Sequence, residues 1–437
     1  MRDQPDENRA VWVAESAPPE PAPRLVGRLT TDVAIIGGGF TGVSTAWHLR
    51  QRQPGLGIAL LEAGVLGQGA SGRNGGQVLN WVNGVEPRTP EETRLVHGAT
   101  RSGIDIAEAL ATRFAPPGTF RRRGCLSVYT DPRRAEAAAS RVEQLRAAGI
   151  PAEFVPGSRL GIHGAYGAVL DPLAGRLNGF ALLQAMRPVL RAEGVALHEH
   201  TLVQRVRSGR EIVLETEGGE VCAKALVLAA GAFTPALGFF RRRLLAIHSH
   251  VLATVKLDDV AWQKIGWGDW DGFTDDLDRI AYACRTPGGR LLLGGGGNAA
   301  YSYRMGGSPK PSPAAEARAA PFMKSVLERY FPGAADARIE RYWAGLLDLS
   351  LDRVCSMGVG GKHRNVYHAL GFSGHGVALA LLAGRVIADL YEGNHEAWRE
   401  QPFYQKRLLP FPPEPALWLG YQVLTRLTGK SPRRRVA

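Results

Sequence analysis

Cysteine is scarce in this chain of 437 residues, and the way it is distributed excludes two kinds of structure. The four residues, Cys125, Cys222, Cys284 and Cys355, lie far apart, and no two have the CxxC spacing of a metal or redox motif. We therefore expect no metal site and no disulfide framework. This cysteine usage fits a reducing compartment, so we expect the protein in the cytoplasm.

Long apolar runs are also missing. No stretch of about 18 apolar residues occurs, so we expect no membrane span. The polar, proline-rich residues 1–24 have no apolar core of a signal peptide. The tail differs, because Leu417, Tyr421, Leu424 and Thr428 follow helical spacing and basic residues come after them. Such a helix can contact a membrane surface peripherally or pack on its own protein, and both options stay open.

Acidic residues are outnumbered, which gives a formal net charge of +12, with arginine runs at 121–123, 241–243 and 433–435. An excess of positive charge can attract nucleic acid or anionic lipid. No nucleic-acid-binding motif accompanies these runs. We interpret them as solvated surface charge and expect no nucleic-acid partner.

Glycine is abundant, with 54 residues, and its most informative cluster follows an apolar segment. Residues 32–36, DVAII, predict a short buried strand, and residues 41–50 have the spacing of a helix. Gly37, Gly39 and Gly42 lie between them as G-x-G-x-x-G. A second predicted strand at 58–61 ends directly before Glu62.

Each part of this cluster suits a bound dinucleotide. Gly37 lets the chain turn sharply, Gly39 lets the backbone approach a pyrophosphate, and Gly42 lets the helix lie close to the sheet. The helix N-terminus offers free N–H groups and partial positive charge to phosphates. Glu62, 25 positions after Gly37, can accept hydrogen bonds from a ribose diol. The alternative is a glycine-rich turn without a ligand.

Three further segments favour FAD over a nicotinamide cofactor. Residues 67–77, GQGASGRNGGQ, form a polar loop where a nicotinamide-binding domain would continue with regular βα units; a mobile surface loop is the alternative. Residues 223–234 predict a buried strand that ends in small residues. Residues 365–390 predict a strand, a glycine-rich turn and a helix, whose N-terminus can stabilise negative charge on a reduced flavin.

These motifs together resemble the FAD-dependent oxidoreductases of the D-amino-acid oxidase superfamily, which includes glycine and sarcosine oxidases. GASGRNGGQ and GFSGHGVALA are most similar to the gamma-glutamylputrescine oxidase type, and the similarity covers about residues 11–391. The resemblance implies an α/β (α+β) fold, with a Rossmann-like FAD-binding domain interleaved with a substrate domain on a mixed or antiparallel sheet. The implied segments are 30–101, 175–238 and 342–392 for the FAD-binding domain, 102–174 and 239–341 for the substrate domain, an N-terminal arm 1–29 and a C-terminal tail 393–437.

The resemblance also implies the chemistry: oxidation of a C–N bond of an amine by hydride transfer to flavin N5, giving an imine that hydrolyses to an aldehyde or ketone. Related enzymes tend to hold an α-carboxylate with an arginine after W-x-G-L, and Leu347 stands there in this chain. We therefore favour an amine substrate, with Arg285, Arg304 and Arg353 as the remaining candidates for a carboxylate. The alternative is a dehydrogenase of D-amino acids or N-methyl amino acids that passes electrons to a quinone. Oxygen or a quinone stays open as the acceptor.

The motifs and the resemblance together indicate one set of cofactor-binding residues. They are Gly37, Gly39, Phe40, Thr41, Gly42, Glu62, Ala63, Ser71, Arg73, Asn74, Gly76, Gln77, Val203, Ala230, Gly231, Gly371, Ser373, Gly374, His375, Gly376 and Val377.

The catalytic candidates are His375, Tyr301 and His250. His375 can bond the flavin or the substrate, or serve local fit at a helix start. His250 and His248 alternate onto one face of a predicted strand. That face lines the pocket or faces solvent. Tyr301 can form an aromatic wall for an amine or pack in a core. Cys355 lies closer to GFSGHG than the cysteine that binds flavin in sarcosine oxidases, so we expect dissociable FAD.

Overall fold

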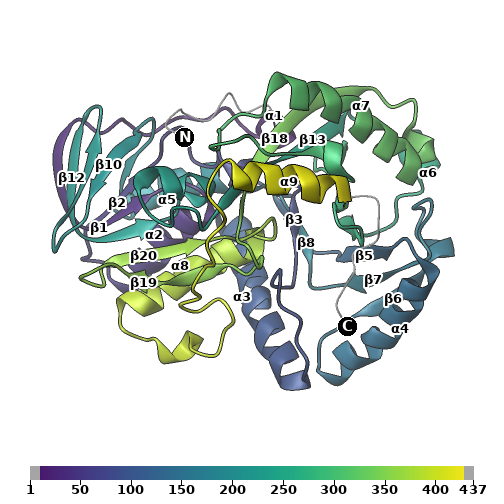
Figure 1. Cartoon of the computed structure of the whole chain (residues 1–437), viewed down its shortest axis with the longest axis horizontal. Coiled ribbons are helices and arrows are strands. Elements are labelled where there is room, and N and C mark those ends of the chain that lie inside the picture. The colour runs from purple at the N-terminus through teal and green to yellow at the C-terminus, as the bar shows by residue number, and fades with distance from the viewer. Residues whose placement is uncertain (1–9, 428–437) are drawn as a thin grey trace.

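The computed structural model describes residues 10–427, which build two large β-sheets side by side. In Figure 1 the first sheet and its helices lie on the left, and the second sheet lies on the right. Thr428 and the arginine run 433–435, both part of the predicted basic tail, lie outside the described residues.

The first sheet has a parallel centre. Its order is β9 (Ala196–His198), β2 (Ile58–Leu61), β1 (Gly27–Ile36), β12 (Gly219–Leu228) and β20 (Val366–Leu370), with each neighbour parallel to the next. The apolar residues of β1 and β2 are buried, as a strand covered on both faces requires. The carboxyl ends of β1, β2 and β12 therefore lie at one edge of the sheet.

Three strands extend this sheet in antiparallel fashion. β10 (Val203–Arg207) pairs with β11 (Ile212–Thr216), which pairs with β12, and β19 (Ser356–Gly360) pairs with β20. A small separate sheet consists of β3 (Gln77–Val78), β8 (Gly175–Leu177) and β4 (Phe120–Arg121), with β8 between the other two strands.

Four helices pack together on the first sheet. They are α2 (Phe40–Arg52), α3 (Pro90–Phe114), α5 (Gly179–Ala192) and α8 (Val377–Tyr391), and their apolar residues form one buried cluster. The helices approach closely at glycines, because a Cβ on Gly384 of α8 would overlap the backbone of α2. α3 caps its first turn with Thr89, whose side chain accepts from the Glu92 amide at 3.1 Å.

The second sheet is mixed and mostly antiparallel, with one parallel pair between β14 and β5. In order its strands are β17 (Tyr301–Ser302), β13 (Leu245–Thr254), β16 (Leu291–Gly295), β15 (Ala281–Arg285), β14 (Gly272–Asp275), β5 (Cys125–Tyr129), β7 (Gly167–Asp171) and β6 (Glu153–Pro156), and β18 (Ile339–Leu349) also pairs with β13. The helices α4 (Pro132–Ala147), α6 (Asp259–Ile265) and α7 (Pro313–Tyr330) complete this side of the molecule.

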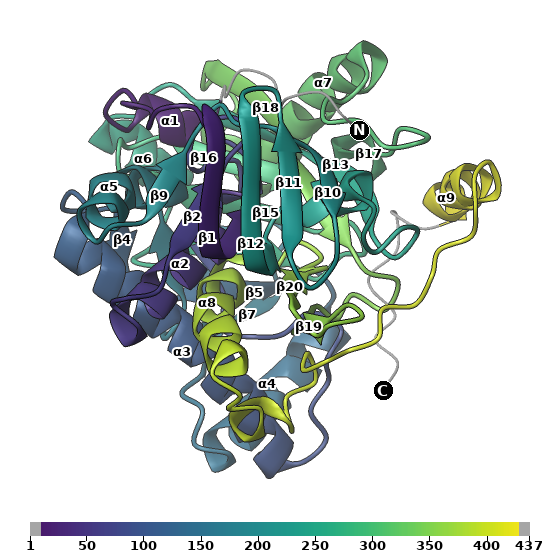
Figure 2. The ribbon, with the colours of Figure 1, turned by 90° about the vertical axis from the view of Figure 1, so that its left-hand side faces the viewer.

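The two ends of the described chain behave differently. α1 (Val11–Ala14) buries Val11 and Trp12 in a cluster formed by strands of the second sheet and by Phe180 of α5. α9 (Ala416–Leu427) follows a long extended segment and stands beside the body, as Figure 2 shows. A helix was predicted in this tail, and α9 confirms it up to Leu427.

The predicted fold class, helix 41–50 and hairpin around residues 287–289 are confirmed, the last by β15 and β16. The division into two interleaved domains stays a prediction, but three of its boundaries fall inside single elements. The boundary 101/102 cuts α3, which packs on α8. The boundary 341/342 cuts β18, which belongs to the second sheet, and residues 27–29 of the predicted arm are part of β1.

Candidate active site

Two connected cavities lie between the sheets. The larger has a volume of about 540 Å³ and the smaller about 140 Å³. Several residues line both, which makes them the joint between the cavities. They are Asn74, Ser249, Tyr282, Leu347, Gly374 and Val377.

The first glycine cluster turns the chain from β1 into α2 at the wall of the larger cavity. Gly37 has a φ of 112°, and a Cβ there would lie 2.5 Å from the carbonyl oxygen of Ala229, which directly follows the neighbouring strand β12. A Cβ on Gly42 would overlap the carbonyl oxygen of Gly37. Gly37 lines the cavity, whereas Gly42 does not, so Gly42 acts by letting α2 approach β1.

The N-terminus of α2 presents backbone donors to this cavity. Gly39, Phe40 and Thr41 line it. The amide of Phe40 donates to Ser71 Oγ at 3.0 Å. Within residues 10–427 the amides of Gly39 and Thr41 have no acceptor. Free amides at a helix N-terminus suit a pyrophosphate.

Glu62 ends β2 at the same wall. Its carboxylate accepts from the amides of Gly38 at 2.7 Å and Gly64 at 2.8 Å. Burial raises the pKa of this carboxyl group, against the effect of the two amides. Each carboxylate oxygen keeps a lone pair for a further donor, so Glu62 can accept from the hydroxyls of a ribose. Ala63 lines the cavity beside it.

The loop 67–77 is a fixed part of the wall, not a mobile surface loop. Arg73 donates from Nη1 to the carbonyl of Ala344 on β18 at 3.0 Å, and Trp343 Nε1 donates to the carbonyl of Arg73 at 3.0 Å. Trp12 Nε1 donates to the carbonyl of Asn74 at 2.8 Å. Ser71, Arg73 and Asn74 line the larger cavity. The loop thus joins β2 to the second sheet.

Gly76 and Gln77 lie further from the larger cavity. A Cβ on Gly76 would lie 2.5 Å from the ring of Trp12, so this glycine makes room for α1. Gln77 lines the smaller cavity and donates from Nε2 to the carbonyls of Phe273 and Ala283 on the second sheet. Their expected role in cofactor binding stays a prediction.

The second glycine cluster joins β20 to α8. Gly371, Ser373 and Gly374 all have positive φ values, of 78°, 55° and 88°. Gly371 donates its amide to Asp348 Oδ2 at 2.7 Å, and burial raises the pKa of Asp348 to about 6. Gly374, the N-cap residue Gly376 and Val377, the first residue of α8, line the larger cavity. Gly371 and Ser373 shape the turn from outside that lining.

Both turn-to-helix junctions therefore line one cavity, together with Val203, Ala230 and Gly231. A cofactor extended from one junction to the other would meet the partial positive charge of two helix N-termini. The cavity offers free amides as donors, a carboxylate with spare lone pairs as an acceptor, and small residues that leave room. This combination fits a dinucleotide. The residues present thus fit FAD.

The three catalytic candidates occupy different places. His375 lines the smaller cavity, with its ring 5.1 Å from the ring of Trp81. Tyr301 also lines it and donates its hydroxyl to the carbonyl of Ile280 at 3.0 Å, and burial raises its pKa strongly. His250 lines neither cavity. It bonds Ser302 Oγ at 3.1 Å, on the opposite face of β13 from Ser249, and burial lowers its pKa to about 4.

Four cavity residues escape the sequence motifs. Tyr282 and Ser249 lie at the joint, with 3.1 Å between their hydroxyl oxygens, and burial raises the pKa of Tyr282 to about 12. Asp348 lies under the second turn, and Arg279 lies in the smaller cavity. Only the strand pairing of β13, β15 and β18 brings these segments together, so no local pattern could have identified them.

Of the three arginines named as candidates, Arg353 alone lines the smaller cavity. Arg285 lies over the ring of Trp262, 4.5 Å from its centre. Arg304 is exposed and donates to Ser308. Cys355 is buried outside the lining of both cavities, and burial raises its pKa to about 12.

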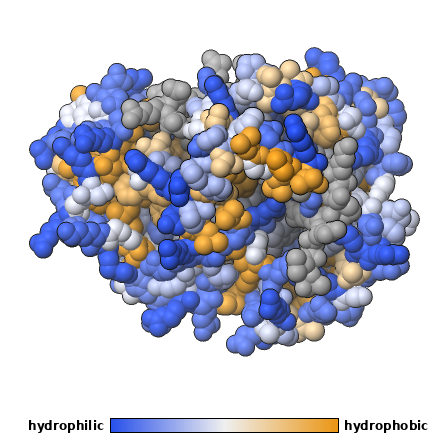
Figure 3. All heavy atoms as spheres, in the orientation of Figure 1, coloured by the Kyte–Doolittle hydropathy of each residue, from blue (hydrophilic) through white to orange (hydrophobic). Residues whose placement is uncertain are grey.

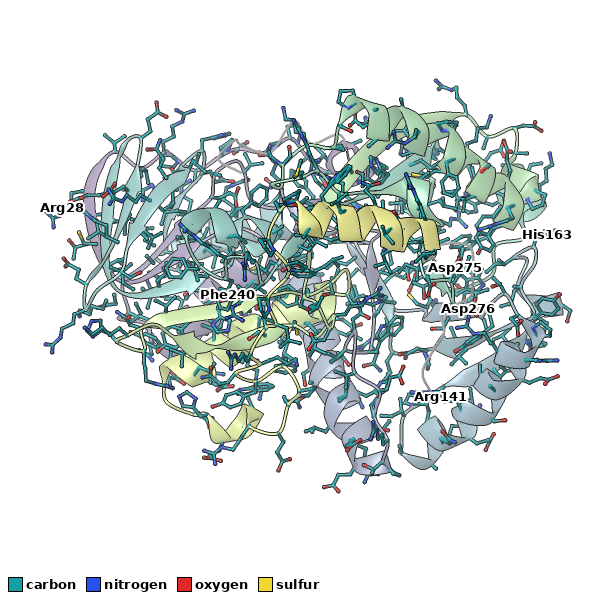
Figure 4. The ribbon with its side chains drawn as sticks, in the orientation of Figure 1. Arg28, Arg141, His163, Phe240, Asp275 and Asp276 are labelled. Atoms are coloured by element: carbon teal, nitrogen blue, oxygen red, sulfur yellow. The ribbon has the colours of Figure 1, made fainter. Side chains whose placement is uncertain are left out.

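Other buried acids serve the structure of the second sheet. Figure 4 labels Asp275 and Asp276 there. Asp275 accepts from the hydroxyl of Tyr330 at 2.6 Å, and Asp276 pairs with Arg134 at 2.9 Å. Over residues 10–427 no group of three His, Cys, Asp or Glu side chains could hold a metal ion, and no helix has the length and apolarity to cross a membrane.

Comparisons with known proteins agree with this geometry. A family model described as DAO, FAD dependent oxidoreductase, matches residues 32–390. Gamma-glutamylputrescine oxidoreductase of Escherichia coli (strain K12) is 28% identical over 403 residues, covering 88% of each chain. Glycine oxidase of Geobacillus kaustophilus (strain HTA426) is 25% identical over 393 residues, covering 85% of this chain and 96% of the relative.

The fold has solved counterparts as well. The crystal structure of glycine oxidase from Geobacillus kaustophilus matches with a TM-score of 0.72 at 21% identity, covering 87% of this chain and 100% of the other.

Proposed function

Because this chain belongs to the family of FAD-dependent oxidoreductases, we propose that it oxidises the C–N bond of an amine. The family and its cofactor, FAD, are those that the motifs predict. Its named relatives are oxidoreductases of amines and amino acids. We place its substrate among gamma-glutamylputrescine-like or related amines, and the product among aldehydes or ketones formed by hydrolysis of an imine.

The observation that carries this proposal is the position of Leu347. It lines the joint between the two cavities, at which the larger cavity, the proposed cofactor site, opens into the smaller cavity. An arginine here would place a positive charge beside the reacting carbon, which suits an α-carboxylate. Leucine offers an apolar wall, which suits an aliphatic amine.

The residues of the joint support the oxidation in two ways. They position the reacting carbon of the substrate, and they exclude water from it. FAD, when bound, supplies an acceptor for two electrons and a proton equivalent. Leu347, Val377 and the ring of Tyr282 would enclose the reacting carbon. A raised pKa keeps Tyr301 protonated at neutral pH, so Tyr301 serves as a wall and not as a base. His375 is the one predicted catalytic residue that we keep close to the reaction.

Absorbance spectroscopy of the purified protein tests the cofactor, and anaerobic bleaching tests the substrate. The panel contains polyamines, their glutamyl derivatives, N-methyl amino acids and D-amino acids. We expect rapid bleaching by amines without an α-carboxylate. Rapid bleaching by D-amino acids alone would contradict the proposal.

The alternative is a dehydrogenase of D-amino acids or N-methyl amino acids that passes electrons to a quinone, and one feature favours such an acceptor. α9 exposes four apolar side chains, which form a hydrophobic patch in Figure 3. They are Leu419, Val423, Leu424 and Leu427. An amphipathic helix of this kind, with Arg426 in its last turn and further basic residues after it in the sequence, can rest on an anionic membrane, where quinones are dissolved. We propose this contact at the membrane face of the cytoplasm, since the four cysteines are free.

Sedimentation with vesicles tests the membrane contact. We expect binding to vesicles with anionic lipid and less to neutral vesicles, and weaker binding of the variant Val423→Glu. Equal sedimentation of the wild type and the variant would contradict a role of α9. The choice between oxygen and a quinone follows from which of them reoxidises the reduced enzyme faster.

A further inference from the structure

The smaller cavity contains an excess of positive charge. Asp278, Arg279 and Arg353 line it, and no other acidic or basic side chain does apart from His375. Within residues 10–427 neither guanidinium forms an ion pair with a carboxylate, Asp278 included. Burial of the guanidinium and the neighbouring Arg279 both lower the pKa of Arg353, and Asp278 opposes this shift only in part, so the pair of arginines lacks one negative charge. A bound anion would supply that charge.

The backbone at Arg353 also indicates a function. Its φ is 66°, in the left-handed region that residues with a side chain rarely adopt. The turn is closed by its amide, which donates to the carbonyl of Ser350 at 3.2 Å. Glycine would adopt this conformation without strain, yet the position holds an arginine that reaches the cavity. Six other non-glycine residues within 10–427 also have positive φ values, so the strain at Arg353 supports a binding role only together with its place in the cavity.

Arg279 is held in position by neutral groups. Its Nε donates to Asn298 Oδ1 at 3.1 Å. Its guanidinium carbon lies 5.8 Å from the ring centre of Tyr301 and 5.9 Å from that of Tyr421 on α9. Asn298 in turn donates to the carbonyl of Thr425, also on α9. These contacts orient the guanidinium and add no negative charge beside it.

The two arginines lie away from the joint. Leu347, Gly374 and Val377 line both cavities, whereas Arg279 and Arg353 line the smaller one only. An anion bound by the arginines is therefore separated from the carbon that reacts at the joint. A carboxylate suits a guanidinium best, since it accepts two parallel hydrogen bonds.

We propose that Arg353 and Arg279 bind a carboxylate at the far end of the substrate. The preferred substrates are then amines whose carboxylate is separated from the reacting C–N bond by an aliphatic chain. This inference rests on the proposed oxidation of an amine, and it adds the second group that the enzyme recognises. Asp278 offers the competing possibility that the far end is an ammonium group, which the experiment includes.

The experiment compares three substrates of equal length in the FAD-bound enzyme. One amine carries a terminal carboxylate, the second the corresponding carboxamide and the third a terminal ammonium. The rate of anaerobic flavin reduction is measured against concentration for each. We expect the carboxylate to be half-saturating at a concentration about 10- to 100-fold lower than the carboxamide, the usual range for a charged hydrogen-bonded pair.

Arg353→Gln should remove that preference and leave the limiting rate of reduction within about threefold, because Arg353 lies away from the joint. Arg353→Lys should restore part of it. Arg304→Gln is the matched control, since Arg304 is exposed outside both cavities. Equal half-saturation by carboxylate and carboxamide, or a preference for the diamine, would overturn the inference while the oxidation of amines stands.

A second measurement does not depend on turnover. Butanoate and glutarate carry no amine, and their binding is followed by the change in flavin absorbance. We expect both to bind the wild type and to bind Arg353→Gln at least about tenfold more weakly. If no amine reduces the flavin but these acids still bind the wild type more tightly than Arg353→Gln, the proposed function fails and the anion site stands. If the acids bind both proteins equally, the anion site fails.

Discussion

The two cavities are built from different parts of the chain. The larger contains the glycine turns and helix N-termini of both junctions, which lie in short segments after β1 and β20. The smaller includes residues of the segments 74–83 and 373–377 in its wall, and its other side chains come mainly from β13, β17, the segment before β15 and the turn after β18, which are distant in sequence. A cofactor bound by the backbone requires glycines at fixed spacing, which the sequence shows. A ligand bound by side chains depends on which strands pair in the folded chain, which the sequence does not show directly. The first cavity is thus predicted to tolerate few substitutions, and the second to change specificity readily.

The largest effect is expected at Gly42. In Gly42→Ala the new Cβ would overlap the carbonyl oxygen of Gly37, so α2 must move away from β1. We expect a loss of stability of about 1–3 kcal/mol from overpacking. The affinity for FAD should fall at least about tenfold, because the amides of the helix N-terminus move with α2. Chemical denaturation and flavin titration measure the two effects.

Gly98→Ala is the matched control. Gly98 lies on the exposed face of α3, and no neighbouring heavy atom lies within 4 Å of the position that a Cβ would take there. Alanine should therefore raise stability by about 0.5–1 kcal/mol. FAD affinity should not change. A Gly42→Ala protein that binds FAD as tightly as the wild type would show that α2 does not position the cofactor.

An intermediate effect is expected at Asp348. Burial raises its pKa from 3.8 to about 6, so the folded chain keeps a proton that the unfolded chain releases. This stabilisation is fully present below about pH 4 and is lost as the pH rises through about 6. Asp348→Asn should remove roughly 2–3 kcal/mol of that pH dependence, which corresponds to the shift of the pKa. Denaturation between pH 4 and 7 measures it.

Asp275 is the control for Asp348. Burial raises its pKa to about 6 as well, but Asp275 does not line the larger cavity. Asp275→Asn should flatten the pH dependence of unfolding in the same direction. Only Asp348→Asn should also change the pH dependence of FAD binding, through the turn at Gly371. If FAD binding depends on pH in the same way in Asp348→Asn and Asp275→Asn, Asp348 does not act on the cofactor site.

The smallest effect is expected at Tyr301. Tyr301→Phe removes a hydrogen bond to the carbonyl of Ile280, which should cost about 1 kcal/mol of stability. The ring remains as a wall, so the rate of flavin reduction should change less than about threefold. A drop of a hundredfold or more in that rate would make Tyr301 an acid–base residue and contradict its role as a wall.

The sequence was most informative where function depends on backbone conformation. Gly37 and Gly374 have positive φ values, and most residues with positive φ in the described chain are glycines, which a sequence displays directly. The strand before Gly37 and the helix after it follow from apolar spacing. The family match over residues 32–390 agrees with both junctions.

The sequence was least informative about which face of a strand meets the cavity. His250 and Ser249 are neighbours on β13, and only Ser249 lines the site. The choice depends on the pairing of β13 with β18 and β16, which local patterns do not encode. Likewise, Arg279 and Arg353 are 74 positions apart, and only the folded chain brings them to one cavity.

The loop 67–77 has a consequence for synthesis on the ribosome. Its contacts run backward to Trp12 and forward to Ala344, and the second helix junction begins at Gly371. Coenzyme capture must then wait until nearly the whole polypeptide has emerged. A nascent chain halted before α8 would expose the apolar face that awaits this helix, and such exposed surface favours aggregation.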